Sequence, residues 1–147
     1  MYNICYRMTN QKEEAEDMLQ ESFTYAFSRL GSFRFESSFG AWLKRIVVNT
    51  CINHLKKRKV DLVYSEQQND PEPEVDHIDY QEIKFQVDNV MKAMEKLPEG
   101  YRVVFSLYML EGYDHKEIAE ILGVTESTSK SQFLRAKQKI KDMLSHE

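Results

Sequence analysis

Basic side chains cluster in two stretches of the chain that contain no acid, and both stretches could bind phosphate. Residues 41–60 hold six lysines and arginines, and residues 127–141 hold five. Residues 61–82, between them, carry eight acids and no lysine or arginine, so the formal net charge of -4 conceals a strong alternation. Clustered cations neutralise the phosphates of nucleic acids. The charge pattern therefore predicts two phosphate-binding surfaces that flank an acidic segment.

The second basic stretch lies within a helix-turn-helix pattern. Asp114 and Glu117 have the spacing of an N-cap and its reciprocating partner, which predicts a short helix over residues 115–122. Gly123 marks a tight turn, and Thr125 caps a second helix that runs from residue 126 to about residue 144. A single turn of this kind also occurs in ordinary helical hairpins. The composition of the second helix has to distinguish a DNA-binding helix-turn-helix from such a hairpin.

The second helix has one face that suits the major groove of DNA. Its predicted inner stripe consists of Ser129, Phe133, Ala136, Ile140 and Met143. Its outer face consists of Ser127, Lys130, Ser131, Leu134, Arg135 and Gln138. Short polar groups and cations without acids can contact base edges and phosphates. On the inner face we expect Ser129 to cost packing energy, because its hydroxyl would face an apolar interior.

Helical periodicity governs the rest of the chain. Apolar residues recur at steps of three and four from Ala15 through Phe27 to Leu30, and again from Phe39 to Leu55. Similar stripes resume at residue 83, and Pro98 opens a further helix. No convincing strand pattern is present. The sequence predicts an all-α fold with two small helical domains, a helical bundle and a helix-turn-helix, joined by an acidic flexible linker.

The break in the helical stripes sets the expected domain boundaries. Residues 1–60 form the first domain, residues 61–82 the linker and residues 83–147 the second domain. The linker combines two prolines with its eight acids, so we expect it to be partly or wholly disordered in the free protein. Residues 2–8 look like the last turns of a longer helix, which suggests a shortened N-terminus. Domains of about 60 residues have marginal cores.

The composition argues against several other classes of protein. No apolar stretch approaches the roughly 20 residues of a membrane helix, and no signal peptide is apparent. Two cysteines, Cys5 and Cys51, are few for a disulfide-stapled secreted chain, so we expect buried, reduced thiols and a cytoplasmic location. His54 lies three residues from Cys51 without further metal ligands, and the glycines form no phosphate loop. We expect no enzyme activity, no cofactor and no metal.

Three blocks of the sequence resemble the extracytoplasmic-function (ECF) group of bacterial RNA polymerase sigma factors. Residues 15–23 (AEDMLQESF) and 33–49 (FRFESSFGAWLKRIVVN) resemble sigma region 2. Residues 97–102 (LPEGYR) and the helix-turn-helix through Arg135-Ala136-Lys137 resemble region 4. Three blocks in the right order are far more specific than one. The resemblance implies a sigma factor that binds core RNA polymerase and directs it to specific promoters for transcription initiation.

The resemblance also implies partners and a polymerase-binding site. Asp17, Gln20, Glu21 and Phe23 fall where the family contacts the clamp helices of the β′ subunit. The first three share a polar helix face with Thr24, although the residues alone would favour a solvated face. The implied partners are core polymerase, through its β′ clamp helices and β flap, promoter DNA and an anti-sigma factor, without insertion into a membrane.

Two DNA sites follow from the same resemblance. The residues implied for the minus-ten element are Phe33, Trp42, Lys44, Arg45, Asn49, Asn53 and Lys56. The residues implied for the minus-thirty-five element are Ser127, Thr128, Lys130, Ser131, Gln132, Leu134 and Arg135. Aromatics, amides and cations together suit the recognition of unpaired bases, although Trp42 taken alone fits a core position better. Ser129 stands where the family usually has Val, and Gln132 where it often has Arg, which leaves the promoter preference open.

Two alternatives remain at this stage. The acidic linker could occupy a basic nucleic-acid channel of the polymerase by charge mimicry, or it could be a solvated tether. The chain could also be a helix-turn-helix regulator that binds an operator as a dimer and acts without polymerase. The basic, loop-interrupted helix of the first domain favours the sigma factor, because a ligand-sensing repressor would need a closed apolar pocket there.

Overall fold

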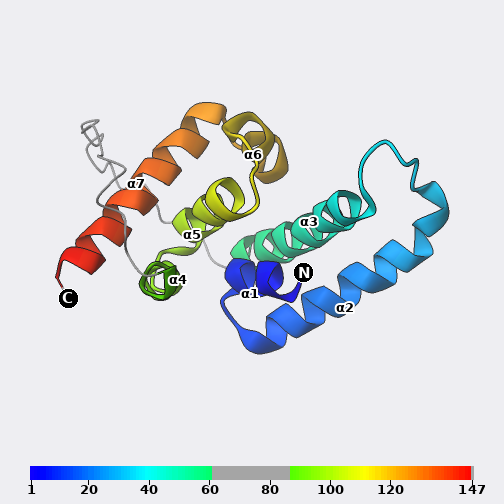
Figure 1. The fold of residues 1–147 in the computed structure, drawn as a ribbon, viewed down its shortest axis with the longest axis horizontal. Helices are drawn as coiled ribbons and strands as arrows, with labels where there is room; N and C mark the ends of the chain where they lie inside the picture. The colour runs from blue at the N-terminus through cyan, green and yellow to red at the C-terminus, as the bar shows by residue number, and fades with distance from the viewer. Residues whose placement is uncertain (61–86, 147) are drawn as a thin grey trace. The chain divides into compact units, whose positions relative to one another are not determined.

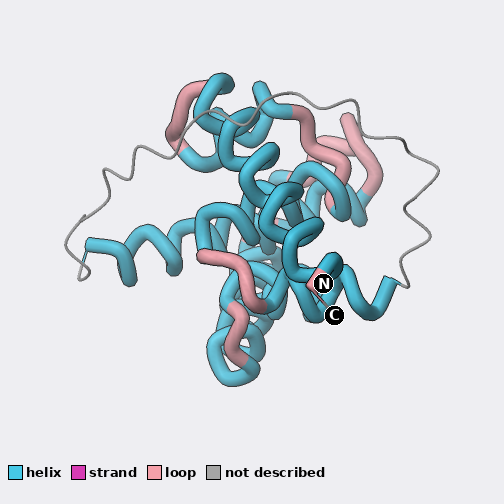
Figure 2. The backbone as a smooth tube through the Cα atoms, turned by 90° about the vertical axis from the view of Figure 1, so that its left-hand side faces the viewer, coloured by secondary structure: helices cyan, strands magenta, loops and turns pink. Residues whose placement is uncertain are grey.

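The computed structural model describes residues 1–60 and 87–146, apart from the side chains of residues 59 and 60, and the acidic linker predicted over residues 61–82 lies outside them. The described residues form helices and loops without strands, which confirms the predicted all-α fold (Figure 2). The chain divides into two compact units, residues 1–66 and residues 67–147. Each unit is described by itself.

The first unit is a bundle of three helices, α1 (Tyr2–Thr9), α2 (Lys12–Ser28) and α3 (Phe39–Val60). The left-handed conformation of Asn10, with φ of 57°, ends α1 and turns the chain into α2. A short 3-10 helix, η1 (Leu30–Ser32), follows α2, and a loop leads into α3, which runs back along α2 (Figure 1). Helix α1 packs against both longer helices.

The core of the first unit lies where these three helices meet. Its fully buried side chains include Met8, Ala15, Val47, Val48 and Cys51. Cys5 and Cys51 are both buried, as predicted. The neighbouring Cys5 thiol and burial raise the pKa of Cys51, so its thiol stays protonated.

The predicted apolar stripe of α2 does not stay buried to its end. Phe27 is 72% exposed and Leu30 is 48% exposed, so the apolar stripe is not covered at its C-terminal end. Helix α2 ends at Ser28, and the chain then leaves in η1 before α3 begins at Phe39. Ala26, in the last turn of α2, is still buried, so the exposed part of the stripe begins at Phe27.

The second unit contains α4 (Val87–Glu95), α5 (Glu99–Phe105), a π-helical turn η2 (Ser106–Leu110), α6 (His115–Leu122) and α7 (Glu126–Ser145). Helices α4, α5 and α6 all pack against α7, which is the longest element of this unit (Figure 1). Its core includes Met94, Leu107, Ile118, Phe133 and Ala136. No helix within the described ranges is long and apolar enough to cross a membrane.

Local capping signals set the helix-turn-helix as predicted. The Asp114 side chain accepts from the backbone N–H of Glu117 at 2.8 Å, and the Glu117 carboxylate accepts from the backbone N–H of Asp114 at 3.1 Å. Gly123 ends α6 in the left-handed region with φ of 69°, where a side chain would be strained. The Thr125 hydroxyl then accepts from the backbone N–H of Thr128 and starts α7.

Candidate nucleic-acid interface

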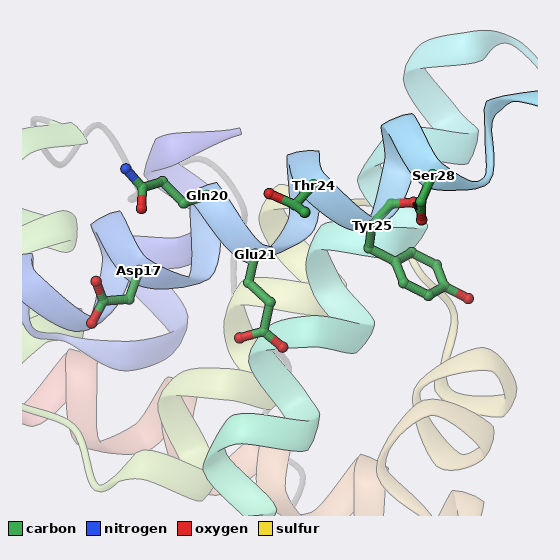
Figure 3. A pocket seen from close by; sticks show the side chains of 6 residues that line it. All are labelled: Asp17, Gln20, Glu21, Thr24, Tyr25 and Ser28. Atoms are coloured by element: carbon green, nitrogen blue, oxygen red, sulfur yellow. Dashed lines mark hydrogen bonds between the residues drawn. The ribbon is translucent and has the colours of Figure 1, made fainter.

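The polar face of α2 forms a shallow, open groove. Its lining residues are Asp17, Gln20, Glu21, Thr24, Tyr25 and Ser28. Figure 3 shows that all six side chains project from successive turns of this helix. Three of the four residues proposed for polymerase binding therefore lie together. Phe23 does not line the groove, because it is half-buried and its ring lies 6.4 Å from that of Phe27.

An aromatic cluster forms at the junction between the loop after η1 and the start of α3. The ring centroid of Phe33 lies 4.6 Å from Phe35, 5.2 Å from Trp42 and 5.8 Å from Phe39. Phe39 also contacts Trp42 at 5.6 Å. Phe33 and Trp42, which the sequence proposed together, thus share one cluster, and both are half-buried. Phe33 and Trp42 form the inner part of the cluster, and the rings of Phe35 and Phe39 form its exposed part.

Phe35 is the most exposed member of this aromatic cluster, and it was not among the residues proposed for DNA binding. Its side chain is 85% exposed. Its φ is 58°, in the left-handed region that non-glycine residues rarely adopt and that costs of order 1 kcal/mol. An exposed aromatic side chain on a strained backbone is unfavourable for the free protein, which is typical of a binding residue. The sequence signal was the density of phenylalanine in residues 33–39.

The N-terminal cap of α3 fixes the position of this cluster. The Ser38 hydroxyl accepts from the backbone N–H of Ala41 at 3.1 Å, and the Ser38 carbonyl accepts from the backbone N–H of Trp42 at 3.1 Å. These bonds begin the helix immediately before Phe39. Trp42 consequently lies three residues into α3, where its ring can reach Phe33 in the loop.

The polar residues proposed on α3 occupy its solvent-accessible surface. Asn49 and Asn53 are exposed one helical turn apart, so their amides lie on one face. Arg45 and Lys56 are also exposed, and Lys44 is half-buried. The face therefore carries two amides and several cations beyond the aromatic cluster, which is the combination that single-stranded nucleic acid requires.

The outer face of α7 is less uniform than the sequence suggested. Ser127, Thr128 and Lys130 are exposed, whereas the other proposed residues, Ser131, Gln132, Leu134 and Arg135, are half-buried. The Thr128 hydroxyl is hydrogen-bonded to that of Thr125 at 2.8 Å, so it takes part in the helix cap. Lys130 lies 3.3 Å from the Glu126 carboxylate one turn earlier. An acid therefore borders this face at its N-terminal end.

Ser129 does not lie among apolar groups alone, so the expectation that its hydroxyl costs packing energy is wrong. The side chain is fully buried, and its oxygen is hydrogen-bonded to Nδ1 of His115 at 2.8 Å. A buried hydroxyl with a partner avoids the penalty of an unsatisfied one. The two residues are 14 positions apart and belong to different helices, so no local pattern could reveal the bond.

Burial lowers the pKa of His115, and the nearby Lys130 ammonium lowers it further, while Glu126 and Asp114 partly oppose both effects. The imidazole is therefore neutral at physiological pH. Elsewhere, Nε2 of His54 lies 3.1 Å from a carboxylate oxygen of Glu14. Among the described residues, no group of three or more His, Cys, Asp or Glu side chains is placed to hold a metal ion.

Comparison with known proteins identifies the family of this chain. Residues 1–60 match the family described as Sigma-70 region 2, and residues 88–140 match the family described as Sigma-70, region 4. The ECF RNA polymerase sigma factor SigW of Bacillus subtilis is 30% identical over 161 residues, which cover 98% of this chain and 82% of that protein. SigM of Mycobacterium tuberculosis is 31% identical over 146 residues, which cover 99% of this chain and 72% of that protein.

Solved structures of sigma factors share the fold. The sigma factor RpoE from Bartonella quintana, in complex with the anti-sigma factor NepR, aligns with a TM-score of 0.62 and 23% identity over 98% of this chain and 89% of that one. CnrH, in complex with the cytosolic domain of CnrY, aligns with a TM-score of 0.57 and 20% identity over 99% and 80%. This chain belongs to the ECF group of RNA polymerase sigma factors, and the resemblance read from its sequence is confirmed.

Proposed function

We propose that this chain binds core RNA polymerase and directs it to specific promoters, with the first unit acting on the minus-ten element and the second on the minus-thirty-five element. The observation that carries this proposal is the presence of both sigma regions in one chain, each with a solvent-accessible face suited to nucleic acid. We place the domain boundaries at residues 1–60 and 83–147, with residues 61–82 as the tether between them.

In the first unit, the aromatic cluster and the amide face of α3 have different roles. Phe35 and Phe39 offer ring faces to an unpaired base, while Phe33 and Trp42 hold those rings in place. Asn49 and Asn53 contact base edges, and Lys44, Arg45 and Lys56 contact the backbone phosphates. Base stacking on aromatic rings contributes about 1–3 kcal/mol per base, which is comparable to the few kcal/mol needed to extrude a base.

In the second unit, α7 enters the major groove. Its exposed N-terminal turns bring Ser127, Lys130 and Ser131 to base edges, with Thr128, Gln132 and Leu134 beside them. Arg135 lies further along the helix and holds a phosphate. Lys130 must exchange Glu126 for DNA on binding, and this exchange is inexpensive because a surface ion pair of this kind contributes only about 0.3–0.5 kcal/mol.

The groove on α2 is the proposed contact with the β′ clamp helices. Its acidic and amide side chains, Asp17, Gln20 and Glu21, pair with a basic or polar helix of the partner, and Thr24, Tyr25 and Ser28 extend the contact along α2. Phe23 would support this surface from within the bundle, and the second unit would contact the β flap. The solved structure of RpoE contains an anti-sigma factor, which supports an anti-sigma partner for this chain as part of the same proposal. A cytoplasmic location also belongs to the proposal. No catalytic or cofactor role is part of it.

A pull-down of core RNA polymerase by the full-length chain tests this proposal against a regulator that acts alone. The wild-type chain should retain core polymerase, and Asp17→Lys or Glu21→Lys should weaken retention at least tenfold. Glu36→Lys is the matched control, because it makes the same charge change at an exposed position of the same unit outside the groove. If the wild-type chain retains no polymerase and instead binds duplex DNA as a dimer, the proposal is wrong.

A further inference from the structure

We propose that His115 is a positioning residue that fixes the rotation of α7 through Ser129 and thereby determines which base edges the outer face of α7 can read. This inference rests on the proposed contact between α7 and the minus-thirty-five element. It concerns two residues that do not themselves touch DNA in the proposal.

The bond between the two residues joins the start of α6 to the second turn of α7. His115 is the first residue of α6, and its Nδ1 lies 2.8 Å from the hydroxyl oxygen of Ser129. Ser129 is fully buried, and its backbone N–H donates to the Thr125 carbonyl within the first turn of α7. Apolar packing tolerates small rotations of a helix, whereas a hydrogen bond is directional and weakens steeply when it is misaligned.

Aromatic contacts hold the imidazole so that the bond has a fixed direction. The Tyr108 ring of η2 is stacked on His115, with centroids 4.4 Å apart and planes inclined by 15°. Phe133, one helical turn after Ser129, meets His115 edge-on at 5.7 Å and contacts Tyr108 at 4.5 Å. The imidazole is therefore clamped between η2 and α7, and only its Nδ1 is bonded to the buried hydroxyl.

The geometry of a helix explains why this rotation matters for base recognition. Side chains reach about 5–6 Å from the helix axis, so a rotation of roughly 20° moves their ends by about 2 Å. A hydrogen bond to a base edge requires a distance of about 2.7–3.2 Å, so such a rotation breaks it. Thr128 and Lys130 flank Ser129 directly, and a bond at Ser129 therefore controls the N-terminal turns that enter the groove.

The test uses holoenzyme assembled from core polymerase and the full-length chain. It is incubated with promoter fragments randomised at the minus-thirty-five element, and the bound fragments are sequenced. Three single variants are compared with the wild type. His115→Phe keeps an aromatic ring for stacking and removes the nitrogens. Ser129→Ala removes the hydroxyl, and His115→Asn offers a polar atom near the position of Nδ1.

The expected result is a change of base preference. His115→Phe and Ser129→Ala should each reduce discrimination at one or more positions by roughly two- to tenfold, as expected for the loss of one hydrogen bond. The double variant should lose no more than either single variant, because both remove the same bond. His115→Asn should retain most of the discrimination. Thermal unfolding, followed by circular dichroism, shows that each variant is folded at the assay temperature.

Two outcomes overturn the inference, and they differ from each other. If both single variants are less stable but keep the wild-type base preference within twofold, the bond only stabilises the unit. If Lys130→Ala also leaves the preference unchanged, or the wild-type holoenzyme shows no preference at this element, then α7 does not read the minus-thirty-five element and the proposed function of the second unit fails as well. Should Ser129→Ala prove unfolded, the comparison of His115→Phe with His115→Asn decides.

Discussion

The Arg58 guanidinium of α3 and the Glu14 carboxylate of α2 form an ion pair in which one nitrogen contacts both carboxylate oxygens. Nη1 of Arg58 donates to the two carboxylate oxygens at 2.9 and 3.2 Å, and Nε2 of His54 lies 3.1 Å from one of them. Although Arg58 belongs to the basic segment 56–59, it ties the end of α3 to the start of α2. The sequence marks these four cations as equivalent, but this one has a structural partner.

Loss of the Glu14 carboxylate should destabilise the first unit. Glu14→Gln should lower its free energy of unfolding by about 1 kcal/mol, a modest value because all three side chains are partly exposed. The change can be measured in urea by the fluorescence of Trp42, which is the single tryptophan of the chain and belongs to this unit. Glu13→Gln, at an exposed neighbouring position, is the control. Equal stabilities of the two variants would show that the ion pair contributes nothing.

Removal of the exposed ring of Phe35 should impair promoter opening without unfolding the protein. Phe35→Ala should change the free energy of unfolding by less than about 0.5 kcal/mol, as is usual at the surface. It should nevertheless reduce open-complex formation about five- to one-hundredfold, which corresponds to the loss of one stacked base. Phe35→Tyr keeps the ring and should remain active. Permanganate reactivity of promoter thymines measures opening, and wild-type reactivity of the alanine variant would remove Phe35 from the site.

The two asparagines of α3 should act after polymerase has bound. Asn49→Ala and Asn53→Ala should leave polymerase binding and closed-complex formation nearly intact, because both side chains are exposed and lie on α3 rather than in the groove of α2. Both should sharply reduce opening, and a template with a pre-melted minus-ten region should restore only part of the loss. If both variants opened duplex promoters normally, the amides would have no role in the site. Loss of polymerase binding would instead indicate a defect in folding or docking.

The stability of the second unit should depend on His115 in mildly acidic solution. Its pKa in the folded protein is lowered from 6.5, mainly by burial. Between the lowered value and 6.5 the unfolded chain binds more protons than the folded chain, so stability falls as the pH drops below about 6.5. Thermal unfolding at pH 7.5 and pH 5.5 should show a larger loss for the wild type than for His115→Phe. Equal losses, or an imidazole that titrates above pH 6.5 by NMR, would contradict this prediction.

Local signals in the sequence were sufficient to predict the helix-turn-helix. Asp114, Gly123 and Thr125 each act on backbone within three or four residues, so the bounds of α6 and the start of α7 follow from their side-chain chemistry. The exposure of Phe27 could not be predicted in this way, because periodicity indicates which face of α2 is apolar but not how far α3 covers it.

Contacts between residues distant in the sequence could not be predicted from local capping signals and periodicity. The bond from His115 to Ser129 depends on how α6 packs on α7, and without it Ser129 looked like an unfavourable hydroxyl in a core. The exposure of Phe35 depends on a left-handed backbone in an irregular loop. Among the residues proposed for polymerase binding, helical spacing placed Asp17, Gln20 and Glu21 in one groove, whereas Phe23 falls on a different side of α2.

Transcription in a purified system tests the central claim most directly. Core RNA polymerase is supplied with the full-length chain and with genomic DNA from the organism that encodes it, and the 5′ ends of the transcripts are mapped. The chain should make the core polymerase start at a limited set of sites that share minus-ten and minus-thirty-five elements at constant spacing, and core polymerase alone should not use these sites. Transcripts that start at the same positions with and without the chain, or a chain that only represses transcription, would contradict its assignment as a promoter-specific sigma factor.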